Sequence, residues 1–222
     1  MADRDAEIRT LAQGATALGL QVEVNAIERA LRLLDELERW SRAYNLTAID
    51  ARSEMLTHHL LDSWSVAKFL HGTRIIDVGT GAGFPGLPLA ILAPDKEFTL
   101  LDSNGKKVRF VAHAARTLGL RNVVAIHARV EEHAPAAPFD TVLTRAFAPL
   151  PELLRKVAGS CGVDTRVLAM KGRRTETARE GLPAGWRIDS DQPLSIPGLA
   201  EERHLLVLRR APDGSAALDS AP

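Results

Sequence analysis

The sequence predicts an α/β fold in which a mostly parallel β-sheet carries helices on both faces. From residue 74 onward, short apolar runs typical of buried strands alternate with helical patterns, as expected for a parallel sheet. The first of these runs, Ile75–Val78, breaks into a glycine-rich turn that opens a helix. Folds of this kind bind ligands at the carboxyl ends of the strands, so functional residues are expected there.

Length and composition fit a single α/β domain with an extension. The chain has 222 residues, of which 45% are hydrophobic and 25% charged, as is usual for a globular protein. Its 28 Lys and Arg balance its 28 Asp and Glu, so any nucleic-acid-binding surface must be local. No apolar run reaches the roughly 18 residues of a membrane span, the N-terminus does not resemble a signal peptide, and the single Cys161 fits a reducing cytoplasm.

An N-terminal helical cap is predicted over residues 1–71. Residues 5–45 are helical by period, because apolar side chains recur there at three-residue steps: Leu31, Leu34, Leu37 and Trp40. A further helical pattern covers residues 54–71. We expect the apolar faces of both segments to pack against the main domain. The adjacent His58 and His59 lack the spacing of metal ligands on a helix, so no metal is expected.

Residues 72–210 are predicted to form the main domain, followed by a disordered tail over residues 211–222. The expected strands lie near residues 74–78, 97–101, 122–126, 139–144 and 165–170. The expected helices lie near residues 85–93, 104–118, 149–159 and 174–180. Two later strand-like segments, Trp186–Ile188 and Leu205–Leu208, predict a hairpin that closes the sheet.

The glycine-rich turn predicts a cofactor site. Gly79, Gly81 and Gly83 stand at alternate positions, where they allow positive φ and a close approach of the backbone to a ligand. The helix that follows directs its N-terminal N–H groups into the same space. Asp77 adds a negative charge at the strand end, which suits the cationic head of S-adenosylmethionine better than a pyrophosphate.

Two alternatives to a methyl-donor site remain open at the turn. Gly81, Gly83 and Gly86 also fit the G-x-G-x-x-G pattern of an NAD-binding fold, with Asp102 at about the expected distance. A glycine-rich turn without any ligand is the other alternative. The charge of Asp77, the chain length and the closing hairpin, which is expected of class I methyltransferases, favour S-adenosylmethionine.

Positions after the second and third strands fit an adenosine-binding role. Asp102 ends the second strand, where a carboxylate can accept both hydroxyls of a ribose. An N-cap for the helix that begins near Gly105 is the alternative role of Asp102. After the third strand, the backbone of Val130 and the carboxylate of Glu131 could meet the adenine edge, although a solvated acidic loop explains them equally well.

The end of the fourth strand, Thr144–Phe147, is expected to face the transferred methyl group and to restrict the acceptor. It has no Asp/Asn-Pro-Pro-Tyr/Phe run, which argues against methylation of an exocyclic amine, and no cysteine for covalent attack on a pyrimidine. An acceptor that is nucleophilic without help, such as guanine N7, fits best. Arg145 is then the candidate catalytic residue, donating to guanine O6 or to the cofactor carboxylate, unless it pairs with a nearby acid.

A local basic rim is the predicted contact with RNA phosphates. Lys171, Arg173 and Arg174 follow the fifth strand, and Lys106 begins a helix at the same edge of the sheet. A solvated charged face is the alternative for each of them.

Eight short segments, in order over residues 40–172, form a combined signature: Trp40, Tyr44–Ile49, His59–Ser63, Asp77–Gly86, Leu101–Ser103, Lys106–Lys107, Thr144–Phe147 and Met170–Gly172. Together they resemble the RsmG (GidB) family of bacterial 16S ribosomal RNA methyltransferases. The resemblance implies a class I methyltransferase fold with an N-terminal helical extension. It also implies S-adenosylmethionine as cofactor and N7 methylation of one guanine of 16S rRNA near the decoding centre.

By the same resemblance, the cofactor contacts are Gly79, Phe84, Asp102, Val130, Glu131 and Arg145, to which the turn adds Asp77 and Gly81. The predicted partner is 16S rRNA, the 30S subunit or an assembly intermediate, without a membrane or a metal. Three alternatives stay open: a small-molecule methyltransferase, an NAD-dependent oxidoreductase, and an RNA-binding protein without activity.

Overall fold

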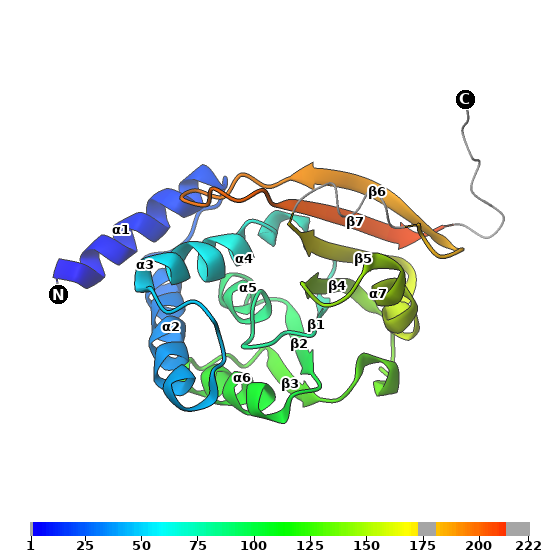
Figure 1. Ribbon diagram of the computed structural model, residues 1–222, viewed down its shortest axis with the longest axis horizontal. Helices are drawn as coiled ribbons and strands as arrows, with labels where there is room; N and C mark the ends of the chain where they lie inside the picture. The colour runs from blue at the N-terminus through cyan, green and yellow to red at the C-terminus, as the bar shows by residue number, and fades with distance from the viewer. Residues whose placement is uncertain (1, 173–180, 212–222) are drawn as a thin grey trace.

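A seven-stranded β-sheet forms the centre of the protein in a computed structural model that describes residues 2–172 and 181–211 (Figure 1). The strands are β1 (Arg74–Val78), β2 (Glu97–Asp102), β3 (Val123–His127), β4 (Phe139–Arg145), β5 (Cys161–Lys171), β6 (Trp186–Pro193) and β7 (His204–Arg210). Their order in the sheet is β3-β2-β1-β4-β5-β7-β6. The first five run parallel to one another, whereas β7 runs antiparallel to both β5 and β6. The predicted α/β class and closing hairpin are confirmed.

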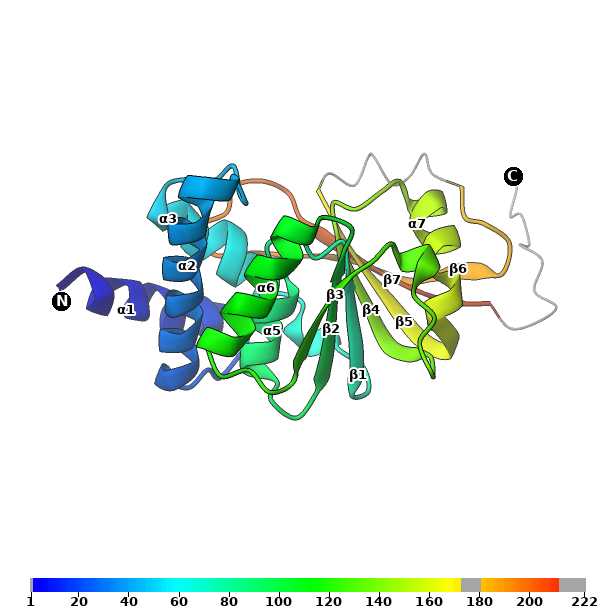
Figure 2. The same cartoon turned by 90° about the horizontal axis from the view of Figure 1, so that it is seen from below.

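Helices cover both faces of the sheet (Figure 2). On one face lie α5 (Gly86–Leu92) and α6 (Gly105–Thr117), and on the other lies α7 (Leu150–Val157). In α6 the side chain of Asn104, not Asp102, is the N-cap, because it accepts from the backbone N–H groups of Lys106 and Lys107. The helix expected near residues 174–180 lies outside the described residues, as does nearly all of the predicted tail.

The helical pattern expected over residues 5–45 is present, divided between two helices. The chain forms α1 (Ala2–Ala17) and α2 (Val24–Tyr44). Between them Gly19 takes a φ of +74°, the left-handed conformation in which glycine commonly ends a helix. The periodic leucines belong to α2 alone and are buried.

The helical pattern expected over residues 54–71 is present but irregular. It comprises α3 (Arg52–Met55), the π-helical segment η1 (Leu56–Leu61), α4 (Asp62–Trp64) and the short 3₁₀ helix η2 (Ala67–Phe69). A π-helical turn is rare and often occurs at functional sites. None of the helices in residues 2–172 and 181–211 is both long and apolar enough to cross a membrane.

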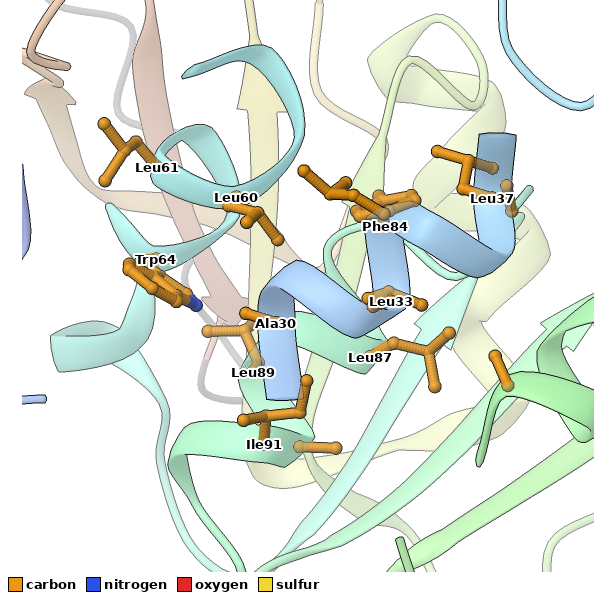
Figure 3. Packing of buried hydrophobic residues seen from close by; sticks show 14 of the residues in the cluster. Ala30, Leu33, Leu37, Leu60, Leu61, Trp64, Phe84, Leu87, Leu89 and Ile91 are labelled. Atoms are coloured by element: carbon orange, nitrogen blue, oxygen red, sulfur yellow. The ribbon is translucent and has the colours of Figure 1, made fainter. Parts of the chain in front are cut away.

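The cap and the sheet-covering helices share one apolar core. Buried side chains of α2, of the segment from Met55 to Val66 and of α5 belong to a single cluster. Figure 3 shows Leu60, Trp64, Leu33 and Leu89 packed together between these elements. A separate cluster on the opposite face of the sheet holds the leucines of α7. The cap is therefore an integral layer of the fold.

Replacing Trp64 with Ala should destabilise the whole protein, because the indole is fully buried in the shared core. We expect the free energy of unfolding to fall by about 3–5 kcal/mol in a single transition, measured by urea denaturation. Val163→Ala, at a side chain that is 80% exposed, is the control and should change it by less than about 0.5 kcal/mol. Separate unfolding of the cap, with the main transition unchanged, would contradict a shared core.

Candidate active site

Asp77 ends β1 with a fully buried carboxylate. Its Oδ2 accepts hydrogen bonds from the Thr80 hydroxyl at 2.7 Å and from the Gly86 backbone N–H at 2.9 Å. Its Oδ1 is also buried and has no hydrogen-bond partner within the described chain. Burial raises the pKa of Asp77 to about 6, against the opposing effect of these hydrogen bonds. The carboxylate thus ties the strand end to the first turn of α5.

The turn needs glycine at two positions for space as well as for conformation. Gly79 and Gly83 have φ values of +68° and +87°. A Cβ on Gly79 would lie 2.3 Å from Cδ2 of Phe147, and one on Gly83 would lie 2.3 Å from Cδ1 of Leu87. The first close approach brings the turn against the end of β4, where methyl transfer is predicted.

A hollow of about 230 Å³ opens at the carboxyl ends of β1, β2, β3 and β4. Four of the predicted cofactor residues line it together: Gly79, Asp102, Val130 and Glu131. They come from three separate loops, so the fold brings them together in the way that the sequence pattern implied. Their contacts with a cofactor remain predictions.

Asp102 holds two loops at the edge of this hollow. Its Oδ2 accepts from the Gly81 N–H at 2.9 Å, and its Oδ1 accepts from the Asn104 N–H at 2.7 Å. Each carboxylate oxygen has further acceptor capacity, so these bonds are compatible with ribose hydroxyls as additional donors.

Glu131 lies at the exposed rim of the same hollow. Its carboxylate is 3.4 Å from Nζ of Lys156, which also pairs with Glu152 at 2.9 Å. A hydrogen bond from its own backbone N–H, and then the charge of Lys156, lower the pKa of Glu131. The group is therefore an ionised acceptor at neutral pH. Val130, in contrast, has a buried side chain, although the residue lines the hollow.

A second hollow, of about 690 Å³, adjoins the first, since Ala146 and Phe147 line both. The cap and the ends of β4 and β5 surround it, together with a residue just before β7: its lining includes His58, His59, Asp62, Arg145, Met170, Lys171 and Arg203. Arg145, Lys171 and Arg203 supply three cations against the single carboxylate of Asp62. This hollow suits an anionic ligand.

Arg145 pairs with an acid, as the sequence left open, and it does so inside the second hollow. Its Nη1 donates to Oδ2 of Asp62 and to the backbone carbonyl of His58, both at 2.9 Å. Its guanidinium carbon is 6.0 Å from the centre of the Phe84 ring. The Phe84 ring in turn stacks on His59, with 4.6 Å between ring centres. Burial, the charge of Arg145 and that of His58 lower the pKa of His59 to about 4, so His59 is neutral.

Ala146 holds the common wall of the two hollows in a strained conformation. Its φ is +51°, a value that residues other than glycine rarely adopt. Such strain persists only where the surrounding structure imposes it, and it is often found at functional sites.

Most of the remaining predicted residues do not line either hollow. Asp77, Gly81 and Phe84 support the turn and line neither hollow. Lys171 lines the second hollow and donates to the Ala148 carbonyl at 3.3 Å. Lys106 is exposed at the start of α6 and lines neither hollow. Two members of the predicted rim, Arg173 and Arg174, lie outside the described residues.

Asp62 and Arg203 are the residues of this site that sequence reasoning missed. Asp62 falls in a segment that carried the family resemblance but no assigned role, and Arg203 lies in a turn-rich stretch. Only their contact across the fold marks them. Within the described residues, no three His, Cys, Asp or Glu side chains are grouped so that they could hold a metal ion.

The sheet order and the helices on both of its faces define a Rossmann-like fold. A solved structure described as a SAM-dependent methyltransferase from Aquifex aeolicus superimposes with a TM-score of 0.54 at 19% sequence identity. The likeness covers 77% of this chain and 98% of that chain. It confirms the predicted fold class.

The particular family follows from the sequence. Residues 26–206 match the family model GidB, described as rRNA small subunit methyltransferase G, and the chain belongs to this family. Two relatives are named ribosomal RNA small subunit methyltransferase G. The one from Methylococcus capsulatus is 47% identical over 199 residues, covering 90% of this chain and 97% of the relative. The one from Pseudomonas syringae pv. syringae is 44% identical over 200 residues, covering 90% and 94%.

Replacing Gly79 with Ala should disturb the wall between the hollows. Gly19 is the matched control, since it has a similar φ of +74° with no atom near its missing Cβ. We expect Gly19→Ala to cost about 1–2 kcal/mol through the left-handed conformation alone. Gly79→Ala should cost roughly 1–3 kcal/mol more, because Phe147 must move. Equal losses of unfolding free energy, measured by urea denaturation, would show that the contact with Phe147 does not matter.

Proposed function

We propose that this protein transfers a methyl group from S-adenosylmethionine to N7 of one guanine in 16S ribosomal RNA, in the cytoplasm. The single observation that carries the proposal is the pair of adjoining hollows. The smaller one has the carboxylates of Asp102 and Glu131 together with Arg129 and Lys156 in its lining, the larger one has three cations and one carboxylate, and they share a wall just after β4. Membership of a small-subunit rRNA methyltransferase family supports a ribosomal acceptor. It also favours a methyltransferase over the NAD-dependent alternative.

The smaller hollow fits S-adenosylmethionine in the chemistry of its donors and acceptors. Asp102 would accept the ribose hydroxyls, while the Val130 backbone and Glu131 would meet the adenine edge. The buried carboxylate of Asp77, whose Oδ1 has no hydrogen-bond partner within the described chain, would add negative charge behind the turn and so favour the sulfonium cation. When bound, this cofactor supplies an electrophilic methyl group on a sulfonium. The likeness to a SAM-dependent methyltransferase fold supports the same choice.

The larger hollow would hold the acceptor guanine. The N7 lone pair lies in the ring plane and no proton must leave before attack, so the enzyme needs alignment and exclusion of water more than a base. Arg145 would donate to guanine O6, next to N7, and thereby set the angle of the ring. The Phe84 ring, stacked on the neutral His59, lies beside the Arg145 guanidinium and would limit its movement.

The proposal is tested by transfer of labelled methyl from S-adenosylmethionine to 30S particles from cells that lack this protein. Borohydride and aniline cleavage then maps any 7-methylguanosine. We expect one cleavage site in 16S rRNA. No incorporation, with cofactor binding intact, would contradict the proposal and favour a small-molecule acceptor.

Replacing Arg145 with Ala should reduce kcat for methyl transfer by about a hundredfold or more, the usual effect of losing a charged group that orients the reaction. The matched control is Arg121→Ala, since Arg121 is exposed and lines neither hollow. Circular dichroism and urea denaturation must show that both variants fold. Full activity of Arg145→Ala would remove the proposed role of Arg145.

The affinity for S-adenosylmethionine should rise with pH through the pKa of Asp77, which burial raises to about 6. Asp77 is neutral below this pH and negative above it, so only the charged form attracts a sulfonium. S-adenosylhomocysteine lacks that charge and is the control ligand. The quantity to compare is the affinity for S-adenosylmethionine divided by that for S-adenosylhomocysteine. Between about pH 5 and pH 7 this ratio should rise, by roughly tenfold for each unit by which the bound sulfonium lowers the pKa of Asp77.

The comparison is made by isothermal titration calorimetry on the wild type and on Asp77→Asn. The asparagine keeps an acceptor oxygen for Thr80 and Gly86 but cannot ionise. A ratio that varies equally with pH in both proteins would exclude Asp77 as its source.

A further inference from the structure

Asp62 joins three distant parts of the chain at the larger hollow. It follows the π-helical segment η1 in the cap. Its Oδ2 accepts from Nη1 of Arg145, at the end of β4, at 2.9 Å. Its Oδ1 is 3.6 Å from Nε of Arg203, in the connection before β7. One carboxylate therefore binds the guanidinium of Arg145 through a hydrogen bond and lies at ion-pair distance from that of Arg203, while its buried Oδ1 accepts no hydrogen bond within the described chain.

The charges around Asp62 do not balance. The Asp62 side chain is 4% exposed, whereas those of Arg145 and Arg203 are each 26% exposed and line the hollow. Two guanidinium groups share one carboxylate, and Lys171 adds a further positive charge to the same hollow. Burying a carboxylate is costly unless its partners compensate. Here the partners of the buried carboxylate are cations that line the surface of a cavity.

The guanidinium groups of Arg145 and Arg203 each have N–H donors besides those directed at Asp62 and at backbone carbonyls. Within the described chain, the hydrogen bonds of Arg145 all start from Nη1. Arg203 directs Nε toward Asp62 and donates from Nη1 to the Glu202 carbonyl at 3.0 Å. A guanidinium has five N–H donors in a planar fork that matches phosphate and carbonyl oxygens. The nucleotides of an RNA chain carry both kinds of acceptor.

We propose that Asp62 is a positioning residue, which orients Arg145 and Arg203 toward the acceptor nucleotide, and that Arg203 binds the RNA. This inference rests on the proposed function, because it assigns the larger hollow to the acceptor. Arg145 takes the base edge, and Arg203 takes a phosphate of the same or the adjoining nucleotide. The cap and the hairpin connection therefore each supply part of the acceptor site.

The protein contains a matched control for this arrangement. Asp189 in β6 also lies between two arginines, at 2.8 Å from Nη1 of Arg187 and 3.1 Å from Nε of Arg209. None of these three residues lines either hollow. Asp189→Asn and Arg209→Ala therefore remove the same chemistry away from the site.

Asp62→Asn separates positioning from simple electrostatics. The substitution removes one negative charge and so raises the net charge of the hollow by one unit. Electrostatic attraction alone would then tighten RNA binding. A positioning role predicts the opposite effect on the reaction. We expect kcat for methyl transfer to 30S particles to fall by about ten- to a hundredfold, as for loss of a charge-assisted hydrogen bond. The cofactor Kd should stay close to that of Asp189→Asn, and the affinity for the particle should not rise, because Arg203 loses the group that orients it.

Arg203→Ala tests the RNA contact, with Arg209→Ala as its control. We expect Arg203→Ala to raise KM for the particle, and its Kd in a filter-binding assay, by about tenfold, and to leave the cofactor Kd unchanged. Arg203→Lys keeps the charge and should restore part of the binding. If Asp62→Asn lowers kcat only in proportion to a loss of folded protein or cofactor binding, Asp62 is merely structural and the inference is wrong.

The binding assay keeps this inference separate from the proposed function. Wild-type methyl transfer that Asp62→Asn and Arg203→Ala leave unchanged would overturn the inference alone. The wild type could instead bind the particle through Arg203 and yet transfer no methyl group to rRNA. That result would overturn the proposed reaction and support the RNA contact. A wild type that neither binds nor methylates the particle would overturn both.

Discussion

Asp77 buries a carboxylate where β1 ends, and the geometry of the glycine-rich turn depends on how that group is satisfied. One oxygen accepts from both Thr80 and Gly86, so the turn must bring a hydroxyl and a helix N–H to the same point. No Cβ fits on Gly86, since it would lie 2.8 Å from that oxygen. The loop so fixed carries Gly79 against Phe147. The wall between the two hollows therefore depends on a hydrogen-bonding requirement in the core.

The cap contributes to the site because it shares the core of the sheet-covering helices. Packing of α2 and of the Met55–Val66 segment against α5 leaves the cap little freedom to move as a unit. The π-helical turn and Asp62 are thereby held over the end of β4. The positive φ of Ala146 costs free energy, at an exposed position between the two hollows. The larger hollow is thus a product of tertiary packing.

Sequence periodicity predicted the parts of the fold that depend on local pattern. Each strand of the parallel sheet lies close to its predicted place, and β5 differs most because it begins at Cys161. The residues of the smaller hollow were predictable too, since strand ends in a parallel sheet converge and Asp102 ends one of them. The break between the first two helices depends on the left-handed conformation of one residue, Gly19, and the π-helical turn depends on packing. Periodicity predicts neither of them. The link from Asp62 to Arg203 depends on the closing hairpin, which brings its connection against the cap, and no local pattern encodes that.

The neutral net charge of the chain constrains how RNA could be recognised. With 28 basic and 28 acidic residues, no global field attracts a polyanion, and interactions between exposed charges fade within about 8 Å at physiological ionic strength. Cations must then act at contact distance, where their orientation matters more than their number. A carboxylate among three cations lowers the local positive charge, which is a disadvantage for attraction alone. It is an advantage if the required property is a fixed direction for each guanidinium, because a buried ion pair removes the rotamers that a free arginine would sample. The acidic residue in a cationic hollow is therefore better explained by geometry than by charge.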